Sequence, residues 1–147
     1  MKYYGAIEAG GTNFICAIGT LDGKILKKTN FPTTTPEETL KKACAFFIEE
    51  NQKTPLASIG IACFGPIDLH KASKTYGAIT TTPKPHWSHF NIVKAIKKEI
   101  DLPISFDTDV NGAALGEHFF GAAKGLNTFL YITVGTGIGV GGMTSSY

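Results

Sequence analysis

Two glycine-rich turns are places where the backbone could bind a ligand. Near the start of the sequence, Gly10 and Gly11 follow an apolar run and precede Thr12 and Asn13. Adjacent glycines let backbone N–H groups point into one concavity and approach a phosphate without interference from side chains. The Thr12 hydroxyl adds a donor. An ordinary β-hairpin turn uses the same residue types, so this turn alone does not separate a ligand loop from a simple hairpin.

The second glycine turn lies near the end of the sequence. Residues 135–142 contain five glycines in eight positions. This is more glycine than a turn needs, and each one costs backbone entropy. We therefore predict that a ligand approaches the backbone here.

Two known nucleotide fingerprints do not fit the second turn. Residues 137–142 match G-x-G-x-x-G, but that fingerprint requires a helix directly after it and an acid about twenty residues further on. The sequence shows neither. The phosphate-loop pattern G-x-x-x-x-G-K-[ST] is absent from the sequence.

A candidate catalytic acid lies between the two turns. Residues 106–117 read as the end of a strand that carries Asp107 and Asp109 and passes into a helix of small residues. At the carboxyl end of a strand, Asp109 would project into the crevice where such sheets bind ligands. Aspartate is also a good helix N-cap, and the local pattern alone favours the cap. The small residues indicate that this helix packs closely on neighbouring backbone.

The elements that position these residues begin with a hairpin pattern. Apolar runs at 3–9 and 14–20 are joined by the first glycine turn, and a third strand is predicted at 25–31. The first third of the chain is therefore predicted to be an antiparallel meander. Thr35 is a good cap residue followed by proline and two acids, so a helix is predicted from residue 36 to about residue 51.

The pattern then changes to alternating strands and helices. The expected elements are a strand at 58–64, a helix at 90–100, a strand at 104–106, a helix from about 110 and a strand at 128–134. Alternation implies parallel strands with crossover connections. The predicted fold class is α/β, with a mixed sheet in which an antiparallel meander is followed by βαβ units. The strand and glycine turn recur near both ends, which indicates two halves related by duplication.

The composition limits the classes of protein to which this chain can belong. The chain has 147 residues, of which 43% are hydrophobic and 18% charged, enough for one globular domain with a core. The net charge of +2 is dispersed, so neither a nucleic-acid nor a membrane-surface partner is expected. No signal peptide or membrane span is predicted, and a cytoplasmic location is expected. Cys16, Cys44 and Cys63 lack CxxC spacing and are predicted to be buried thiols.

Taken in order, these segments resemble the ROK family of sugar kinases, in the actin and hexokinase superfamily, and within it the bacterial fructokinases. The resemblance rests on residues 8–12, 64–68, 82–87, 107–111 and 133–142. It implies an actin-like ATPase (ribonuclease H-like) fold and phosphoryl transfer from MgATP to the 6-hydroxyl of a hexose, with fructose favoured. Residues 1–126 would form the N-terminal domain, and residues 127–147 the start of a second, truncated domain.

The resemblance assigns the phosphate and magnesium contacts. The β- and γ-phosphates would be held by Gly10, Gly11, Thr12 and Asn13 and by Gly135, Thr136, Gly137 and Gly139, where Thr136 contributes a hydroxyl. Glu8 occupies a position that is aspartate in many relatives, and it would hold Mg²⁺ through water. Asn13 replaces a lysine that is common in the family.

The resemblance also assigns the sugar site and the base. Asp109 matches the catalytic aspartate that accepts the hydroxyl proton. The sugar site would comprise Gly65, Pro66, Thr82, Thr108 and Asp109, and Thr108 stands where many relatives have a sugar-binding asparagine. Trp87 is either part of this site's wall or, more commonly for tryptophan, part of the core. His86 and His89 are expected to be surface residues rather than zinc ligands.

Two other functions remain open at this stage. The family includes sugar-responsive repressors, but these carry a helix-turn-helix before the first phosphate motif, and here that motif begins at Glu8. The zinc motif, further sugar ligands and adenosine-binding segment of the relatives lie downstream of the second turn and are not in this sequence. The chain is therefore expected to be a kinase portion, inactive alone or paired with a partner, from an enzyme that is a homodimer at full length.

Overall fold

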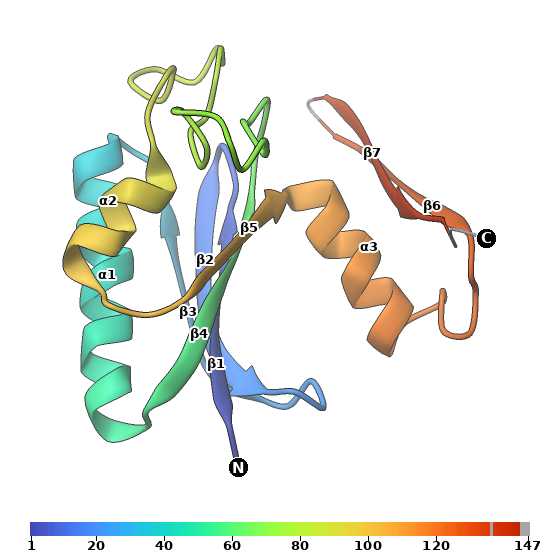
Figure 1. Cartoon of the computed structure of the whole chain (residues 1–147), viewed down its shortest axis with the longest axis horizontal. Helices are drawn as coiled ribbons and strands as arrows, with labels where there is room; N and C mark the ends of the chain where they lie inside the picture. The colour runs from blue at the N-terminus through green and yellow to red at the C-terminus, as the bar shows by residue number, and fades with distance from the viewer. Residues whose placement is uncertain (136, 145–147) are drawn as a thin grey trace.

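The computed structural model describes residues 1–135 and 137–144 (Figure 1), so the predicted role of Thr136 lies outside the described residues. Its main sheet has five strands in the order β3-β2-β1-β4-β5. Their bounds are β1 Tyr3–Ala9, β2 Asn13–Thr20, β3 Ile25–Pro32, β4 Leu56–Cys63 and β5 Ile104–Thr108. The first three strands are antiparallel neighbours, whereas β1, β4 and β5 run parallel. The predicted mixed α/β sheet is confirmed.

Helices cover both faces of this sheet (Figure 1). Helices α1 (Pro36–Lys53) and α2 (Ile92–Glu99) lie on one face, and α3 (Asp109–Phe120) lies on the other. Helix α1 begins where the cap was predicted, since the Thr35 side chain accepts a hydrogen bond from the Glu38 N–H. Helix α2 begins two residues later than predicted, because the Asn91 side chain caps it by accepting from the Lys94 N–H.

Strand β5 is longer than the sequence pattern predicted. It was expected to end at Phe106, but it pairs with β4 through Asp107 and Thr108. Helix α3 follows without a loop. The sequence pattern did not predict this extension, because the polar residues at the end of β5 interrupt the apolar run although the pairing with β4 continues.

The core lies between the main sheet and α1 and α2, and Trp87 is its largest fully buried side chain. The Trp87 ring centroid lies 5.6 Å from that of Phe14, 5.7 Å from that of Phe64 and 5.6 Å from that of Phe90. Its indole N–H donates to the Thr34 carbonyl at 2.8 Å. Trp87 was predicted to be either part of the sugar-site wall or part of the core, and the structure supports its place in the core.

The cysteines are buried free thiols, as predicted. Burial, and secondarily the neighbouring Cys44, raises the pKa of Cys16 to about 12. Burial, followed by the charge of Glu99, raises the pKa of Cys44 to about 11. Burial is also the main cause of a raised pKa at Cys63, with the Asp109 carboxylate adding to it. Such thiols stay protonated at neutral pH and are poor nucleophiles.

A separate hairpin follows α3. Strands β6 (Phe129–Val134) and β7 (Ile138–Met143) form an antiparallel two-stranded sheet that packs against α3 (Figure 1). Among the described residues, no helix is both long and apolar enough to cross a membrane.

Candidate active site

Three parallel strands end side by side at one edge of the main sheet (Figure 1). The register pairs Ala9 with Cys63 and Cys63 with Thr108. The Phe64 N–H donates to the Ala9 carbonyl at 2.8 Å, so the pairing continues one residue past β4. The first glycine turn, the segment after Cys63 and Asp109 therefore begin at the same edge, although they are far apart in the sequence.

Asp109 does not cap helix α3. The cap is Thr108, whose side-chain oxygen accepts a hydrogen bond from the Asn111 N–H at 3.2 Å. Asp109 is the first residue of the helix and is half-buried, and its Oδ1 accepts the Val110 N–H at 2.9 Å. Capping therefore does not explain the acid at position 109, although an acid in the first turn is favoured by the helix dipole. The sugar contact of Thr108 stays a prediction.

A cleft of about 520 Å³ lies between the main sheet and α3. Glu8, Asp107 and Asp109 line it, so the structure brings the predicted magnesium ligand and the predicted base into one cleft. The remaining wall is largely made of small or apolar residues, including Ala6, Gly60, Ala62, Gly112 and Ala113. The predicted sugar-site residues Gly65, Pro66 and Thr82 are not among the described residues that line it.

A carboxylate–amide pair that the sequence analysis missed fixes the joint between β5 and α3. Asp107 Oδ1 accepts the Thr108 N–H at 2.7 Å and the Asn111 side-chain N–H at 2.7 Å. These contacts hold the residues on either side of Asp109. The available signal was the spacing of four residues between Asp107 and Asn111 across a strand–helix junction.

The first glycine turn is held by a hydrogen bond within the turn and by Thr33, which directly follows β3. The Gly10 N–H donates to the Asn13 carbonyl at 3.0 Å, and a Cβ at Gly10 would lie 2.6 Å from that carbonyl oxygen. Thr33 holds the turn from outside, because its hydroxyl donates to the Gly10 carbonyl at 2.7 Å. Gly11 differs, since a Cβ there would meet no atom within 4 Å. Glycine at position 10 is thus needed by the turn, whereas packing does not require it at position 11.

The second turn contains glycines of two kinds. Cβ atoms at Gly135 and Gly137 would meet nothing within 4 Å. A Cβ at Gly139 would lie 2.8 Å from Val110 Cγ1, and one at Gly141 would lie 2.6 Å from the Val110 carbonyl carbon and oxygen. These last two glycines let β7 lie directly on the first turn of α3. That contact brings the second turn close to the N-terminus of α3, next to Asp109.

Replacement of Gly141 tests this helix–hairpin contact. We expect Gly141→Ala to destabilise the fold by about 1–3 kcal/mol, because the new methyl overlaps backbone atoms of α3. Gly116→Ala is the matched control: Gly116 lies within α3 in open space, and alanine there should stabilise the helix by up to about 1 kcal/mol. Equilibrium unfolding of both variants measures the difference. Equal stability of the two variants would contradict the packing.

The loop between β4 and α2 is organised by Asp68. Its carboxylate accepts the Ser73 and Thr75 hydroxyls, each at 2.6 Å, and the His70 N–H at 3.0 Å. The hydroxyl of Ser73, followed by those other donors, holds the pKa of Asp68 below its ordinary value. The same loop is tied to Pro66, whose carbonyl accepts the Thr80 N–H at 2.8 Å.

The order of this loop is therefore expected to depend on pH. Because the folded-state pKa of Asp68 is lowered, its contribution is fully present above the ordinary carboxyl pKa of about 3.9 and is lost as pH falls through the folded-state value. Amide hydrogen exchange at His70 and Thr75 should accelerate over that range. Asp68→Asn should remove this change, whereas Asp101→Asn, at an exposed aspartate, should leave it in place.

Hydrogen bonds between Thr82 and Ser88 close the loop that contains Trp87. The Thr82 N–H donates to Ser88 Oγ at 3.0 Å, and that hydroxyl donates back to the Thr82 carbonyl at 2.9 Å. His86 and His89 adopt left-handed backbone conformations, with φ of 71° and 60°. Within residues 1–135 and 137–144, no group of three or more His, Cys, Asp and Glu side chains is arranged to hold a metal ion.

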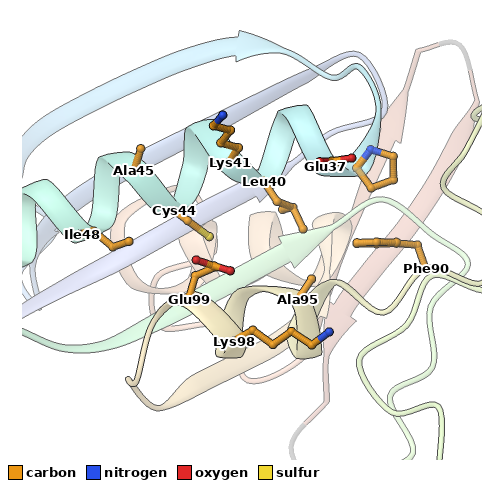
Figure 2. Close-up of a pocket in the computed structure, with 11 residues that line it drawn as sticks. Glu37, Leu40, Lys41, Cys44, Ala45, Ile48, Phe90, Ala95, Lys98 and Glu99 are labelled. Atoms are coloured by element: carbon orange, nitrogen blue, oxygen red, sulfur yellow. The ribbon is translucent and has the colours of Figure 1, made fainter.

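A second cavity, of about 560 Å³, lies between α1 and α2 on the opposite face of the sheet (Figure 2). Its floor includes Leu40, Cys44 and Ala95, and Figure 2 shows the Cys44 side chain directed toward Glu99. None of the predicted site residues lines this second cavity. Of the predicted site residues that the structure describes, Glu8 and Asp109 line the cleft on the α3 side, whereas the glycines of the two turns do not.

This arrangement, an antiparallel meander continued by parallel strands in one mixed sheet, is that of the actin-like ATPase fold. A Streptomyces griseus ROK family glucokinase, solved in complex with glucose and AMPPNP, matches 97% of this chain with a TM-score of 0.82 and 26% identity, and the match spans 44% of that glucokinase. The ROK family profile matches residues 4–145. The chain therefore belongs to the ROK family.

Curated relatives narrow the comparison to sugar kinases. The chain is 49% identical over 140 residues to a fructokinase of Streptococcus mutans, covering 95% of this chain and 46% of that protein. It is 48% identical over 145 residues to a fructokinase of Lactococcus lactis subsp. cremoris, covering 99% of this chain and 48% of that protein. The chain thus spans about half the length of these relatives.

Proposed function

We propose that this chain forms part of an ATP-dependent hexose kinase that transfers the γ-phosphoryl group to the 6-hydroxyl of the sugar, with fructose as the favoured substrate. The observation that carries the proposal is the position of Asp109. It lies at the carboxyl edge of the parallel strands and lines a cleft, and Thr108 rather than Asp109 caps the helix. Relatives that are about half identical to this chain are fructokinases.

The glycines that packing does not require support the phosphate sites. Gly11, Gly135 and Gly137 have open space at the Cβ position, which leaves room for a ligand to approach the backbone there. Gly60, which lines the cleft, and Gly116 in α3 share this property. Gly139 is different, because its contact with Val110 already accounts for glycine at that position. In our proposal Gly11, Thr12, Gly135 and Gly137 are the principal backbone contacts of the phosphates.

The residues of the cleft have separate roles in the proposed reaction. When bound, MgATP supplies the phosphoryl group and the charge that neutralises its oxygens. Glu8 is exposed and lines the same cleft as Asp109, which fits a magnesium ion held through water. Asp109 accepts the proton of the attacking hydroxyl, which moves late in a loose phosphoryl-transfer transition state. Asp107 and Asn111 keep the joint that carries Asp109 in place.

A chimera tests the proposal directly. This chain would replace the segment that it matches in the Lactococcus lactis fructokinase, and fructose-dependent ATP consumption would be followed in a coupled assay. We expect turnover with fructose, and less with glucose or mannose. A folded chimera that consumes no ATP with any hexose would overturn the proposed function. The 147-residue chain alone is expected to show no turnover, because it spans about half the length of the fructokinases it matches and a kinase needs both walls of its cleft to position donor and acceptor.

Other expectations from the sequence stay predictions. These are a cytoplasmic location, a homodimeric full-length enzyme, and the division into residues 1–126 and 127–147. A zinc site in full-length relatives likewise stays an expectation.

A further inference from the structure

Thr33 is a buried polar residue that makes two hydrogen bonds to the first glycine turn. Only 5% of its surface is exposed. Its hydroxyl donates to the Gly10 carbonyl at 2.7 Å, and its backbone N–H donates to the Thr12 carbonyl at 2.8 Å. A buried hydroxyl needs a hydrogen-bond partner, but that need does not require both bonds to go to the same turn. One residue therefore fixes two carbonyl groups of this turn.

These two hydrogen bonds also set the direction of N–H groups in the turn. In a trans peptide, the carbonyl of one residue and the N–H of the next lie in one plane and point in opposite directions. Because the Gly10 carbonyl is directed at Thr33, the Gly11 N–H points away from Thr33. The Asn13 N–H points away for the same reason, since the Thr12 carbonyl accepts from Thr33.

The N–H groups of the turn differ in their availability to a ligand. The Gly10 N–H is used within the turn, because it donates to the Asn13 carbonyl at 3.0 Å. Within the part of the chain that the structure describes, the N–H groups of Gly11 and Thr12 donate to no backbone acceptor. Gly11 is half-buried and Thr12 is exposed. Oxygens of a phosphate can accept from N–H groups of this kind, so the orientation that Thr33 imposes falls on a donor that a ligand can use.

The segment that carries Thr33 is itself held firmly. The N–H of the next residue, Thr34, donates to the Thr39 hydroxyl of α1 at 3.0 Å, and the Thr34 carbonyl accepts the Trp87 indole N–H at 2.8 Å. Thr39 and Trp87 are both fully buried. The chain between β3 and α1 is thus tied to a helix and to the core, and it gives the glycine turn a rigid support.

We propose that Thr33 is a positioning residue for nucleotide binding, which holds the first glycine turn with the Gly11 N–H directed toward a phosphate of ATP. This assignment rests on the proposed function for the identity of the ligand. Thr33 acts through the turn and does not touch the nucleotide. Without its hydroxyl the Gly10 carbonyl loses its partner, and the peptide between Gly10 and Gly11 can rotate, because a glycine on each side permits other backbone conformations.

The test removes the Thr33 hydroxyl from the fructokinase chimera. We expect Thr33→Val to lower the affinity for MgADP, measured by calorimetric titration, about three- to tenfold, which corresponds to the loss of one hydrogen bond. KM for ATP should rise by a similar factor and KM for fructose by less than about twofold, because the turn contacts only the nucleotide. Thr33→Ser keeps the hydroxyl and should bind MgADP like the unsubstituted chimera. Thr29→Val is the matched control, since Thr29 lies on β3 opposite Cys16, away from the turn.

Thermal unfolding checks that each variant folds, and Thr33→Ala repeats the test with a smaller side chain. If Thr33 only stabilises the fold, Thr33→Val will have a lower unfolding midpoint and an unchanged affinity for MgADP, and this result would overturn the proposal. A serine variant as weak as the valine variant, or an equal loss of affinity in Thr29→Val, would do the same.

The proposed function can fail separately from this inference. A chimera that binds MgADP but phosphorylates no hexose would refute the proposed function, whereas the titrations of the Thr33 variants would still decide the positioning role. An active chimera in which Thr33→Val binds MgADP as tightly as the unsubstituted protein would refute this inference alone. An unsubstituted chimera that binds no MgADP would overturn both.

Discussion

Asp109→Asn in the fructokinase chimera is expected to lower kcat by about 10²–10⁴-fold, the range for loss of a general base, while KM for fructose changes by only a few fold. The amide keeps the size of the side chain but cannot accept the proton of the attacking hydroxyl. Steady-state kinetics with fructose and ATP varied separately will distinguish these parameters. An unchanged kcat would remove Asp109 from the proposed catalytic role.

The structure permits a control that separates catalysis from helix capping. Because Thr108 and not Asp109 caps α3, Asp109→Asn should leave the stability of the fold nearly unchanged. Thr108→Ala should instead cost about 1 kcal/mol, as the loss of a cap does. Asp101→Asn, at an exposed aspartate before β5, should alter neither property. A loss of stability in Asp109→Asn that matches Thr108→Ala would show that Asp109 has a structural role.

Trp87→Ala is expected to destabilise the chain by about 3–5 kcal/mol, the usual cost of deleting a buried tryptophan. The ring is fully buried among three aromatic side chains, and its N–H is hydrogen-bonded to the Thr34 carbonyl. Much of the stability of a small domain would then be lost. Urea unfolding followed by circular dichroism gives the difference without relying on tryptophan fluorescence.

Phe119→Ala is the matched control for this prediction. Phe119 is also aromatic but is 59% exposed near the end of α3, so its removal should change stability by no more than about 0.5 kcal/mol. Similar losses in the two variants would mean that Trp87 does not hold the core together. If Trp87 instead formed the wall of a sugar site, the main effect in the chimera would be on KM for fructose.

Much of the element order is predictable from local sequence. The meander follows from apolar runs separated by glycine turns, and the start of α1 follows from Thr35 and Pro36, because caps and turns act over only a few residues. Asp107 shows the limit of this reasoning. The apolar run of this strand ended at Phe106, whereas pairing with β4 extends β5 through Asp107 and Thr108. Strand pairing is a long-range contact that residue type does not encode.

The sequence by itself determined the α/β class, the two glycine turns and the acid between them. Only the tertiary structure showed which of these residues packing requires and which it does not. Thr108 and Asp109 are both good caps, so the geometry of the joint decides between them. Glycines 139 and 137 look alike in sequence, yet one is required by contact with α3 and the other has open space. The physical reason is that a glycine or an acid is explained by its spatial neighbours, and those neighbours come from distant parts of the chain.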